Sequence, residues 1–508
     1  MNKPLNVPGS VPTSAYSRLE QRFRRLSALQ EASGMLHWDM ATVMPDGGRP
    51  ARAEQLATLG VVCHEILTDT ETGATLDQAE EEASGLTPWQ RANLAEMRRS
   101  HTHATALDSA LVEAMSKACT ACEAVWREAR PKADFASVYP LLSEVLNLTR
   151  QAATAKAEKL GCTPYEALMD QYEAGAREAD IDRVFADYGA FLPEFLPRVL
   201  EHQARRGKPI EPKGPFPQSV QKDLAKRLMQ GLGFDFKHGR LDESHHPFCG
   251  GVPEDVRITT RYSEDHFVQA LMGVIHETGH ALYERNLPAE WRLQPVGQAR
   301  GMTVHESQSL LMEMQAARSA QFCKHLSGLL RETFPGNAAA LSPENLQLIY
   351  SRVQPGFIRV DADEVTYPAH VILRYGIEKA LFRDDLQLAD VPGVWNAEFK
   401  KLLGLDVPSD REGVLQDLHW YDGAFGYFPC YSLGAMTAAQ LFEAACAAHP
   451  DIPAEIEQGK FATLQGWLKT NVHSLGSSLS TPDLVTRATG RPLDVGVFKR
   501  HLERRYLR

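Results

Sequence analysis

The five residues His276-Glu277-Thr278-Gly279-His280 carry the strongest chemical signal in this sequence. They form an HExxH pattern, and in a helix residues i and i+4 lie one turn apart on the same face. Two imidazoles placed in this way can bind one metal ion, and Glu277 beside them can act as general base on a metal-bound water. The pattern predicts a zinc site with the chemistry of a metallopeptidase.

The residues around the motif favour a buried helix over a chance match. The apolar stripe with helical spacing consists of Val268, Leu271, Met272, Ile275, Gly279 and Leu282. Ser263, followed by two acidic residues, is expected to start this helix, and Asn286 with Pro288 to end it. An unpaired Glu277 would be costly in a core helix, whereas a metal explains the glutamate and both histidines together.

A catalytic zinc usually has three protein ligands and one water. A second helix-like run begins near Gly301 and contains His305, Glu306 and Glu313. We expect Glu306 to be the third ligand, because Asn286 stands where the pattern HExxHxxGxxH would place a third histidine. His305 and Glu313 remain alternatives, and Glu313 could instead orient a ligand histidine.

The composition is that of an ordinary globular protein, with 43% hydrophobic and 23% charged residues among 508. The 54 basic and 65 acidic residues give a net charge of −11 without a Lys/Arg-rich block, so no nucleic-acid partner is expected. The sequence shows no signal-peptide pattern and no run of about 18 apolar residues, which predicts a cytoplasmic protein without a membrane partner. Eight scattered cysteines fit reduced thiols, and Cys119 with Cys122 is not expected to bind metal.

Most of the sequence has helical periodicity and residues that favour helices. The expected helical segments are residues 14–34, 51–69, 88–130, 136–159, 179–205, 217–232, 264–286, 303–333, 343–353, 369–383, 395–404 and the part from about 434. Residues 255–262 alternate apolar and polar side chains, which predicts a strand that either pairs with a peptide substrate or belongs to a structural sheet. Without repeats or linkers, residues 1–508 are expected to form one catalytic domain, in two lobes around a cleft.

Further motifs make the sequence similar to the thermostable (Taq-type) zinc carboxypeptidases, a family of HExxH gluzincins. The matching segments are His246-Pro247-Phe248 (HPF), residues 255–259 (DxRxT), His305-Glu306-Ser307 (HES), residues 358–363 (IRxxAD), residues 413–420 (GxxQDxHW), and an N-terminal stretch from His37 to Gln55. They occur in the family's order from about residue 37 to 420. The resemblance therefore covers nearly the whole chain.

The resemblance implies a mainly α fold: a large helical clamshell with a deep active-site groove and a small β-sheet, similar to angiotensin-converting enzyme and neurolysin. It implies one zinc ion per chain on His276, His280 and Glu306, with Co²⁺ or Mn²⁺ as possible substitutes. It also implies removal of single residues from peptides with a free C-terminus, with broad specificity, by a homodimer.

The family's Arg that binds the substrate carboxylate corresponds to Arg359, and a guanidinium group can bind a carboxylate through two donors. The alternative for Arg359 is a salt bridge to Asp361 or Asp363. Tyr427 and Tyr431 are candidates for stabilising the oxyanion. His246 and His419 are candidates for substrate binding; these four candidates are each equally expected to be structural.

Three other functions remain open at the level of sequence. The same zinc site could serve an oligoendopeptidase that lacks a carboxylate clamp, or a dipeptidyl carboxypeptidase. The chain could also be a non-catalytic peptide-binding or zinc-stabilised scaffold. Glu277 argues against the scaffold, because a structural zinc site is normally closed by four protein ligands and needs no base. Arg359 favours cleavage at the C-terminus over internal cleavage.

Overall fold

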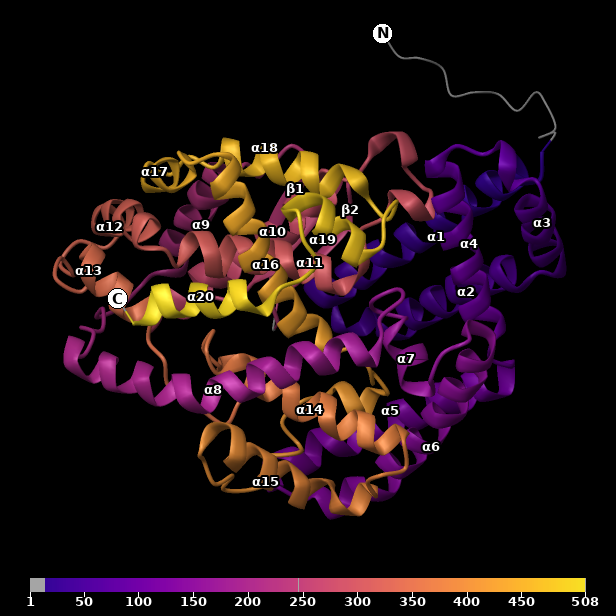
Figure 1. Ribbon diagram of the computed structural model, residues 1–508, viewed down its shortest axis with the longest axis horizontal. Coiled ribbons are helices and arrows are strands. Elements are labelled where there is room, and N and C mark those ends of the chain that lie inside the picture. Colours follow the sequence, from indigo (N-terminus) through magenta and orange to yellow (C-terminus); the bar gives the residue numbers. More distant parts are fainter. Residues whose placement is uncertain (1–13, 245, 508) are drawn as a thin grey trace, which may run out of the picture. The chain divides into compact units, whose positions relative to one another are not determined.

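The computed structural model describes residues 14–244 and 246–507. These residues form a mainly helical protein with one small sheet, as the sequence predicts (Figure 1). Within the described residues, no helix is both long and apolar enough to cross a membrane. The first 13 residues, on which the expectation about a signal peptide depends, lie outside the described part.

Contacts within the chain divide it into two compact units. The first unit contains residues 14–105, 288–298 and 476–478. Its helices are α1 (Ala15–Thr42), α2 (Arg49–Thr68), α3 (Thr70–Glu81) and α4 (Pro88–Thr105). They pack around a small apolar core that includes Leu19 and Leu94.

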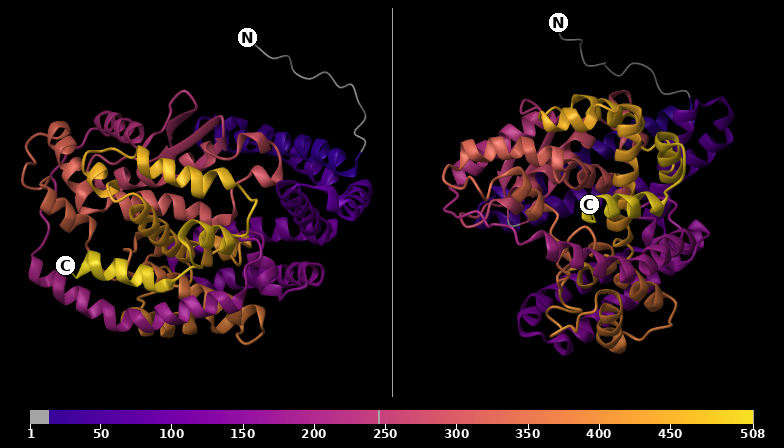
Figure 2. Two further views of the ribbon diagram at one scale, coloured as in Figure 1. Left: turned by 45° about the horizontal axis from the view of Figure 1, so that its top comes forward. Right: turned by 60° about the vertical axis from the view of Figure 1, so that its left-hand side comes forward.

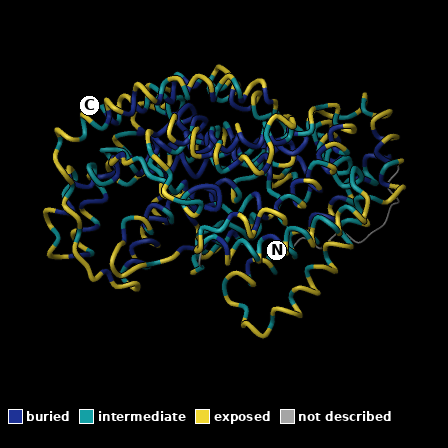
Figure 3. The backbone as a smooth tube through the Cα atoms, turned by 90° about the horizontal axis from the view of Figure 1, so that it is seen from below, coloured by how far each residue is buried: buried dark blue, intermediate teal, exposed yellow. Residues whose placement is uncertain are grey.

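The second unit contains the rest of the described chain, including every residue predicted to do chemistry. Its helices are α5 (Ser109–Lys132), α6 (Phe135–Leu160), α7 (Pro164–Met169), α8 (Glu178–Arg206), α9 (Gln218–Leu232), α10 (Val268–Arg285), α11 (Gly301–Leu310), α12 (Ala320–Thr333), α13 (Pro343–Tyr350), α14 (Tyr367–Phe382), α15 (Val391–Leu403), α16 (Pro429–Ala448), α17 (Ile452–Glu457), α18 (Ala462–Asn471), α19 (Thr481–Thr489) and α20 (Val495–Tyr506). The yellow C-terminal helix α20 runs beside α8 (Figure 2). Buried and exposed residues alternate along many helices (Figure 3), as expected when each helix buries one face.

The predicted strand is the central strand of a three-stranded sheet. β3 (Asp255–Thr260) pairs in parallel with β1 (Gly239–Glu243) and antiparallel with β2 (Cys249–Val252). Because both edges of β3 are occupied, this strand cannot accept a peptide substrate as a further strand. Its buried Val256 and Ile258 belong to a core to which α10 contributes, so the sheet supports the helix that carries the HExxH motif.

One predicted helix is broken in two, and one predicted helix start is wrong. The expected helix 88–130 is two helices, because the Asp108 side chain accepts the Leu111 N–H at 2.8 Å and caps α5. The motif helix begins at Val268 instead of near residue 264. The Glu264 carbonyl accepts the Phe216 N–H at 2.8 Å, so it is not part of a helical hydrogen-bond series.

Two other expected helices also differ in detail. The segment 303–333 is interrupted by a widened π-helical turn, Leu311–Ala317, which separates α11 from α12. The last helical region starts at Pro429 instead of about residue 434. Proline is tolerated there because the first-turn N–H groups of a helix have no intrahelical acceptor.

Candidate metal centre

The HExxH motif lies on α10, most of whose residues are buried against β3, α9 and α11. Gly279 within the motif permits the close approach of α11. A Cβ atom at this position would lie 2.5 Å from the Gln308 carbonyl oxygen and 2.7 Å from the Ser309 Cα. The distance between the two helices therefore depends on this glycine.

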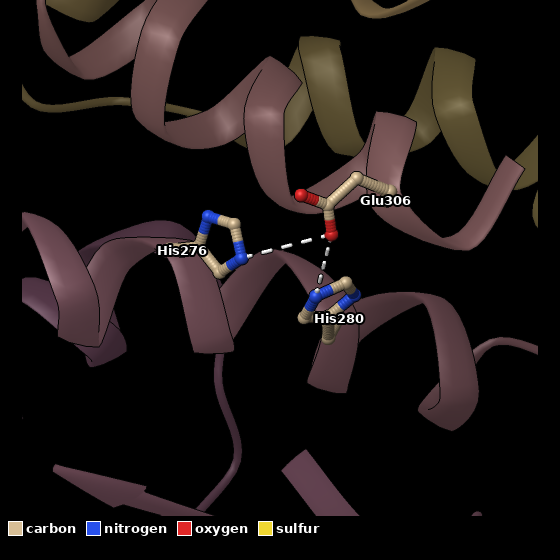
Figure 4. A group of neighbouring side chains, drawn as sticks. All are labelled: His276, His280 and Glu306. Carbon is tan, nitrogen blue, oxygen red and sulfur yellow. Dashed lines mark ion pairs between the residues drawn. The ribbon is translucent and has the colours of Figure 1, made fainter. Parts of the chain in front are cut away.

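Helix α11 brings Glu306 to the two motif histidines (Figure 4). Glu306 Oε2 lies 3.9 Å from His276 Nε2 and 3.4 Å from His280 Nε2. One potential ligand atom from each residue lies within 4.8 Å of the other two. Two imidazoles and a carboxylate at this spacing fit one metal ion that keeps an open position for water.

A hydrogen bond on the other ring nitrogen orients His276. Its Nδ1 lies 2.9 Å from Glu313 Oε2, and Glu313 Oε1 accepts from Arg318 Nη2 at 2.6 Å. Because the carboxylate can only accept, Nδ1 donates to it, which leaves Nε2, the atom that faces Glu306, as the position for a metal ion. Glu313 is thus placed to orient a ligand histidine, which was one of its two expected roles.

A second chain of hydrogen bonds orients His280. Its Nδ1 lies 2.7 Å from His305 Nδ1, and His305 Nε2 lies 2.8 Å from Glu284 Oε1. If His305 donates to the Glu284 carboxylate, its Nδ1 accepts from His280, whose Nε2 is then free to bind a metal. Both ring nitrogens of His305 are engaged, so the geometry favours Glu306 over His305 as a ligand.

Three carboxylates around the histidines favour a positive charge between them. Burial by itself lowers the pKa of His276, but the hydrogen bond to Glu313 and the charge of Glu306 raise it to about 10. Burial opposes ionisation of Glu306, yet the adjacent histidines lower its pKa to about 2. The electrostatic field of these carboxylates, which favours a proton on His276, also favours a metal cation at its Nε2.

Burial raises the pKa of Glu277 to about 7, and the charge of Glu306 acts in the same direction, whereas His276 opposes it. The Glu277 side chain is 7% exposed and lies on the same helix as both histidines. A carboxyl group with a pKa near neutrality can take up and release a proton at physiological pH.

Buried contacts fix α11 and its Glu306. At the first turn of α11, the buried carboxylate of Glu173 accepts the Thr303 N–H at 3.0 Å. Gly301 has φ +43°, and a Cβ there would lie 2.5 Å from a Glu173 carboxylate oxygen. On α16, a Cβ at Gly434 would lie 2.9 Å from the Glu306 Cβ and Cγ atoms. Gly301 and Gly434 therefore make room for the carboxylates of Glu173 and Glu306.

Arg359 belongs to a second buried cluster of charges. Its Nε and Nη2 donate to Asp417 Oδ1 at 3.1 and 2.9 Å, and its Nη1 donates to the Tyr367 hydroxyl at 2.7 Å. The fully buried Arg374 donates from Nε to Asp417 Oδ2 at 2.7 Å. Two guanidinium groups share this one carboxylate.

The Arg359 cluster carries surplus positive charge. Among the described residues, Arg359 forms its ion pair with Asp417 and not with Asp361 or Asp363. The Asp363 carboxylate accepts backbone N–H groups instead. Glu378 acts electrostatically on the cluster, but burial raises its pKa to about 7, so it adds only a partial negative charge. One N–H on each Nη of Arg359 has no acceptor among the described residues, and such a pair of donors suits a further carboxylate.

Three of the remaining predicted residues border this cluster. The Tyr431 ring centre lies 4.8 Å from the guanidinium carbon of Arg359 and 5.1 Å from the Tyr427 ring centre. His419 Nε2 lies 3.3 Å from the Tyr431 hydroxyl, and burial lowers the His419 pKa to about 4, so this ring is neutral at pH 7. His246 is exposed between β1 and β2, and no described contact joins it to the others.

Sequence reasoning gave no role to Asp417, Arg374 or Glu284, although Asp417 stands in one of the matching motifs. Asp417 follows Arg359 by 58 residues and Arg374 by 43, so no helical or strand period relates them. Glu284 lies one turn after His280 on α10, and this i+4 spacing is the signal that could have found it.

An HExxH helix with a nearby glutamate on a second helix is the arrangement of a metallopeptidase. The family model described as carboxypeptidase Taq (M32) metallopeptidase matches residues 18–506. The chain therefore belongs to this family, and it is a metallocarboxypeptidase, an enzyme that hydrolyses peptides. The family resemblance inferred from the motifs is confirmed.

The chain is similar to known proteins over nearly its full length. It is 35% identical to thermostable carboxypeptidase 1 of Thermus thermophilus over 510 residues, covering 98% of this chain and 99% of that protein. It is 34% identical to carboxypeptidase 1 of Bacillus subtilis, covering 95% and 96%. Trypanosoma cruzi metallocarboxypeptidase 1 superposes with a TM-score of 0.95 at 43% identity, covering 97% and 99%. The expected helical fold with a small sheet is confirmed.

Proposed function

We propose that this chain is a zinc-dependent carboxypeptidase that removes single C-terminal residues from peptides with broad specificity. His276, His280 and Glu306 would hold Zn²⁺, Glu277 would act as general base, and Arg359 would bind the substrate's C-terminal carboxylate. The observation that carries this proposal is the buried Arg359 cluster, in which two guanidinium groups share one carboxylate and two N–H donors of Arg359 remain unused.

In this mechanism Arg359 fixes the substrate's C-terminus and so selects the last peptide bond. When bound, Zn²⁺ makes water more acidic and polarises a carbonyl group. Glu277 takes the proton of the attacking water and passes it to the leaving amine, in keeping with its pKa of about 7. Burial raises the pKa of both Tyr427 and Tyr431, so their hydroxyl groups stay protonated and can donate to the oxyanion.

Several finer expectations belong to the same proposal. His419 and His246 are proposed to contact substrate, and each chain is proposed to bind one zinc, with Co²⁺ or Mn²⁺ as substitutes. The enzyme is further proposed to be a cytoplasmic homodimer. Residues 1–508 are proposed to act as one catalytic domain, whose two lobes enclose a deep groove like that of angiotensin-converting enzyme or neurolysin.

The test compares an N-blocked peptide with its C-terminally amidated twin, with and without a metal chelator, by mass spectrometry. Sequential loss of single residues from the free acid only, abolished by chelator and restored by zinc, is the expected result. Loss of residue pairs would instead identify a dipeptidyl carboxypeptidase. Internal cuts in both peptides would identify an oligoendopeptidase, and no cleavage after zinc reconstitution would contradict the assigned active site.

A further inference from the structure

The π-helical turn Leu311–Ala317 carries Glu313, the carboxylate that orients His276. At its C-terminal end the Arg318 N–H donates to the Glu313 carbonyl and the Ser319 N–H to the Ala316 carbonyl. Neither of these N–H groups therefore serves the carbonyl oxygens of Met314 and Gln315. A widened turn has poorer hydrogen-bond geometry than an α-helix and needs support from outside.

Arg505, near the end of α20, supplies that support. Its Nη1 donates to the Met314 carbonyl and its Nη2 to the Gln315 carbonyl, the latter at 3.2 Å. One guanidinium group thus caps two successive carbonyl groups of the turn, from a position about 190 residues later in the chain. The Arg505 side chain is 10% exposed, so water competes little for these bonds.

Glu364 holds Arg505 in place. Its Oε2 accepts from Arg505 Nη1 at 3.0 Å and from the Tyr506 hydroxyl at 2.9 Å. Its Oε1 lies 2.9 Å from His501 Nε2 and accepts from Gln315 Nε2 at 3.1 Å. The buried carboxylate therefore has four partners, three on α20 and one on the π-helical turn.

From these contacts we infer that Arg505 and Glu364 are positioning residues for the metal ligand His276. The geometry of the metal centre therefore depends on the C-terminal helix α20. Arg505 fixes the backbone directly after Glu313, Glu313 fixes the His276 ring, and the ring directs Nε2 toward Glu306. The inference rests on the metal site proposed above. The metal site would then depend on α20, a helix that contributes none of its ligands.

The test measures the Zn²⁺ dissociation constant of the full-length protein against a chromogenic chelator, for wild type and R505M. Groups that orient a ligand histidine typically change metal affinity by about 10- to 100-fold, and we expect about tenfold weaker binding because Arg505 acts through Glu313. R504M is the matched control: Arg504 is 47% exposed on the same helix and pairs at 3.5 Å with Glu443. Its zinc affinity should equal that of wild type.

A double-mutant cycle with E313A separates positioning from general stability. If Arg505 acts through Glu313, R505M should change zinc affinity less than about twofold in the E313A background. An equal loss in both backgrounds, or an unchanged affinity in folded R505M, would overturn the inference. If R505M does not fold, E364Q replaces it, with the same expected direction. Wild type without zinc affinity would instead refute the metal site itself.

Discussion

Replacing Arg359 by Met should abolish the preference for a free C-terminus. In the structure one N–H on each Nη of Arg359 is unused, and the side chain is 6% exposed. Hydrogen bonds to charged groups contribute about 1.5–3 kcal/mol each, so two contribute about 3–6 kcal/mol. This corresponds to a fall in kcat/KM of about 10²- to 10⁴-fold on free-acid peptides. Hydrolysis of the amidated twin should not change.

The assay measures kcat/KM for both peptides at saturating zinc. R352M is the control, because Arg352 is exposed seven residues earlier, and its side chain's one ion pair within the described part of the chain is with Glu211 at 3.9 Å. Arg374 keeps Asp417 paired in the Arg359 variant, so thermal unfolding and metal content should show a folded, loaded protein. A folded R359M enzyme that still prefers the free acid as strongly as wild type would refute the assigned clamp.

Three further predictions concern the base, the helix packing and the response to acid. E277Q should lower kcat by at least about 10²-fold while one zinc stays bound, and retained turnover would remove Glu277 from its role as base. G279A should destabilise the protein by about 1–3 kcal/mol and weaken zinc binding, because its Cβ would overlap the Gln308 backbone. Chemical denaturation and chelator competition measure these two effects. The control is G273A, whose Cβ meets nothing within 4 Å and which should change neither stability nor zinc affinity. Burial lowers the pKa of His473 to about 3, below its unfolded value of about 6.5. The unfolded chain therefore binds more protons in that window, so this residue should reduce stability by about 1.4 kcal/mol per pH unit as pH falls from 6.5 to 3. Urea titrations of wild type and H473Q at several pH values check this, and identical pH slopes would contradict it.

Helical content and the central strand were predictable because their causes are local. Periodic apolar positions and favourable helix formers mark the helices, and alternation with β-branched residues marks residues 255–260. Predicted helix boundaries were wrong where residues distant in sequence form hydrogen bonds with the backbone. The Glu264 carbonyl accepts a hydrogen bond from Phe216, and the chain after Leu310 widens into a π-helical turn whose carbonyls are capped by Arg505.

The residues of the candidate site likewise fall into those that the sequence predicts and those that only the structure places. His276 and His280 share a face because one helical turn relates them, whatever the rest of the chain does. The sequence left open whether Glu306, His305 or Glu313 completes the set. The structure separates their positions because Gly279 and Gly434 let α11 approach α10 and α16 closely, which places Glu306 toward both Nε2 atoms and the other two behind the rings.

The sequence by itself determined the family and the helix of the HExxH motif, and it singled out Arg359, since motifs of a few residues carry their chemistry in residue type and spacing. The tertiary structure alone decided the partners: Asp417 and Arg374 at Arg359, and Arg505 at the π-helical turn. The reason is physical. Pairing of buried charges depends on which helices pack together and at what distance, and separations of 43 to about 190 residues leave no periodic trace in the chain.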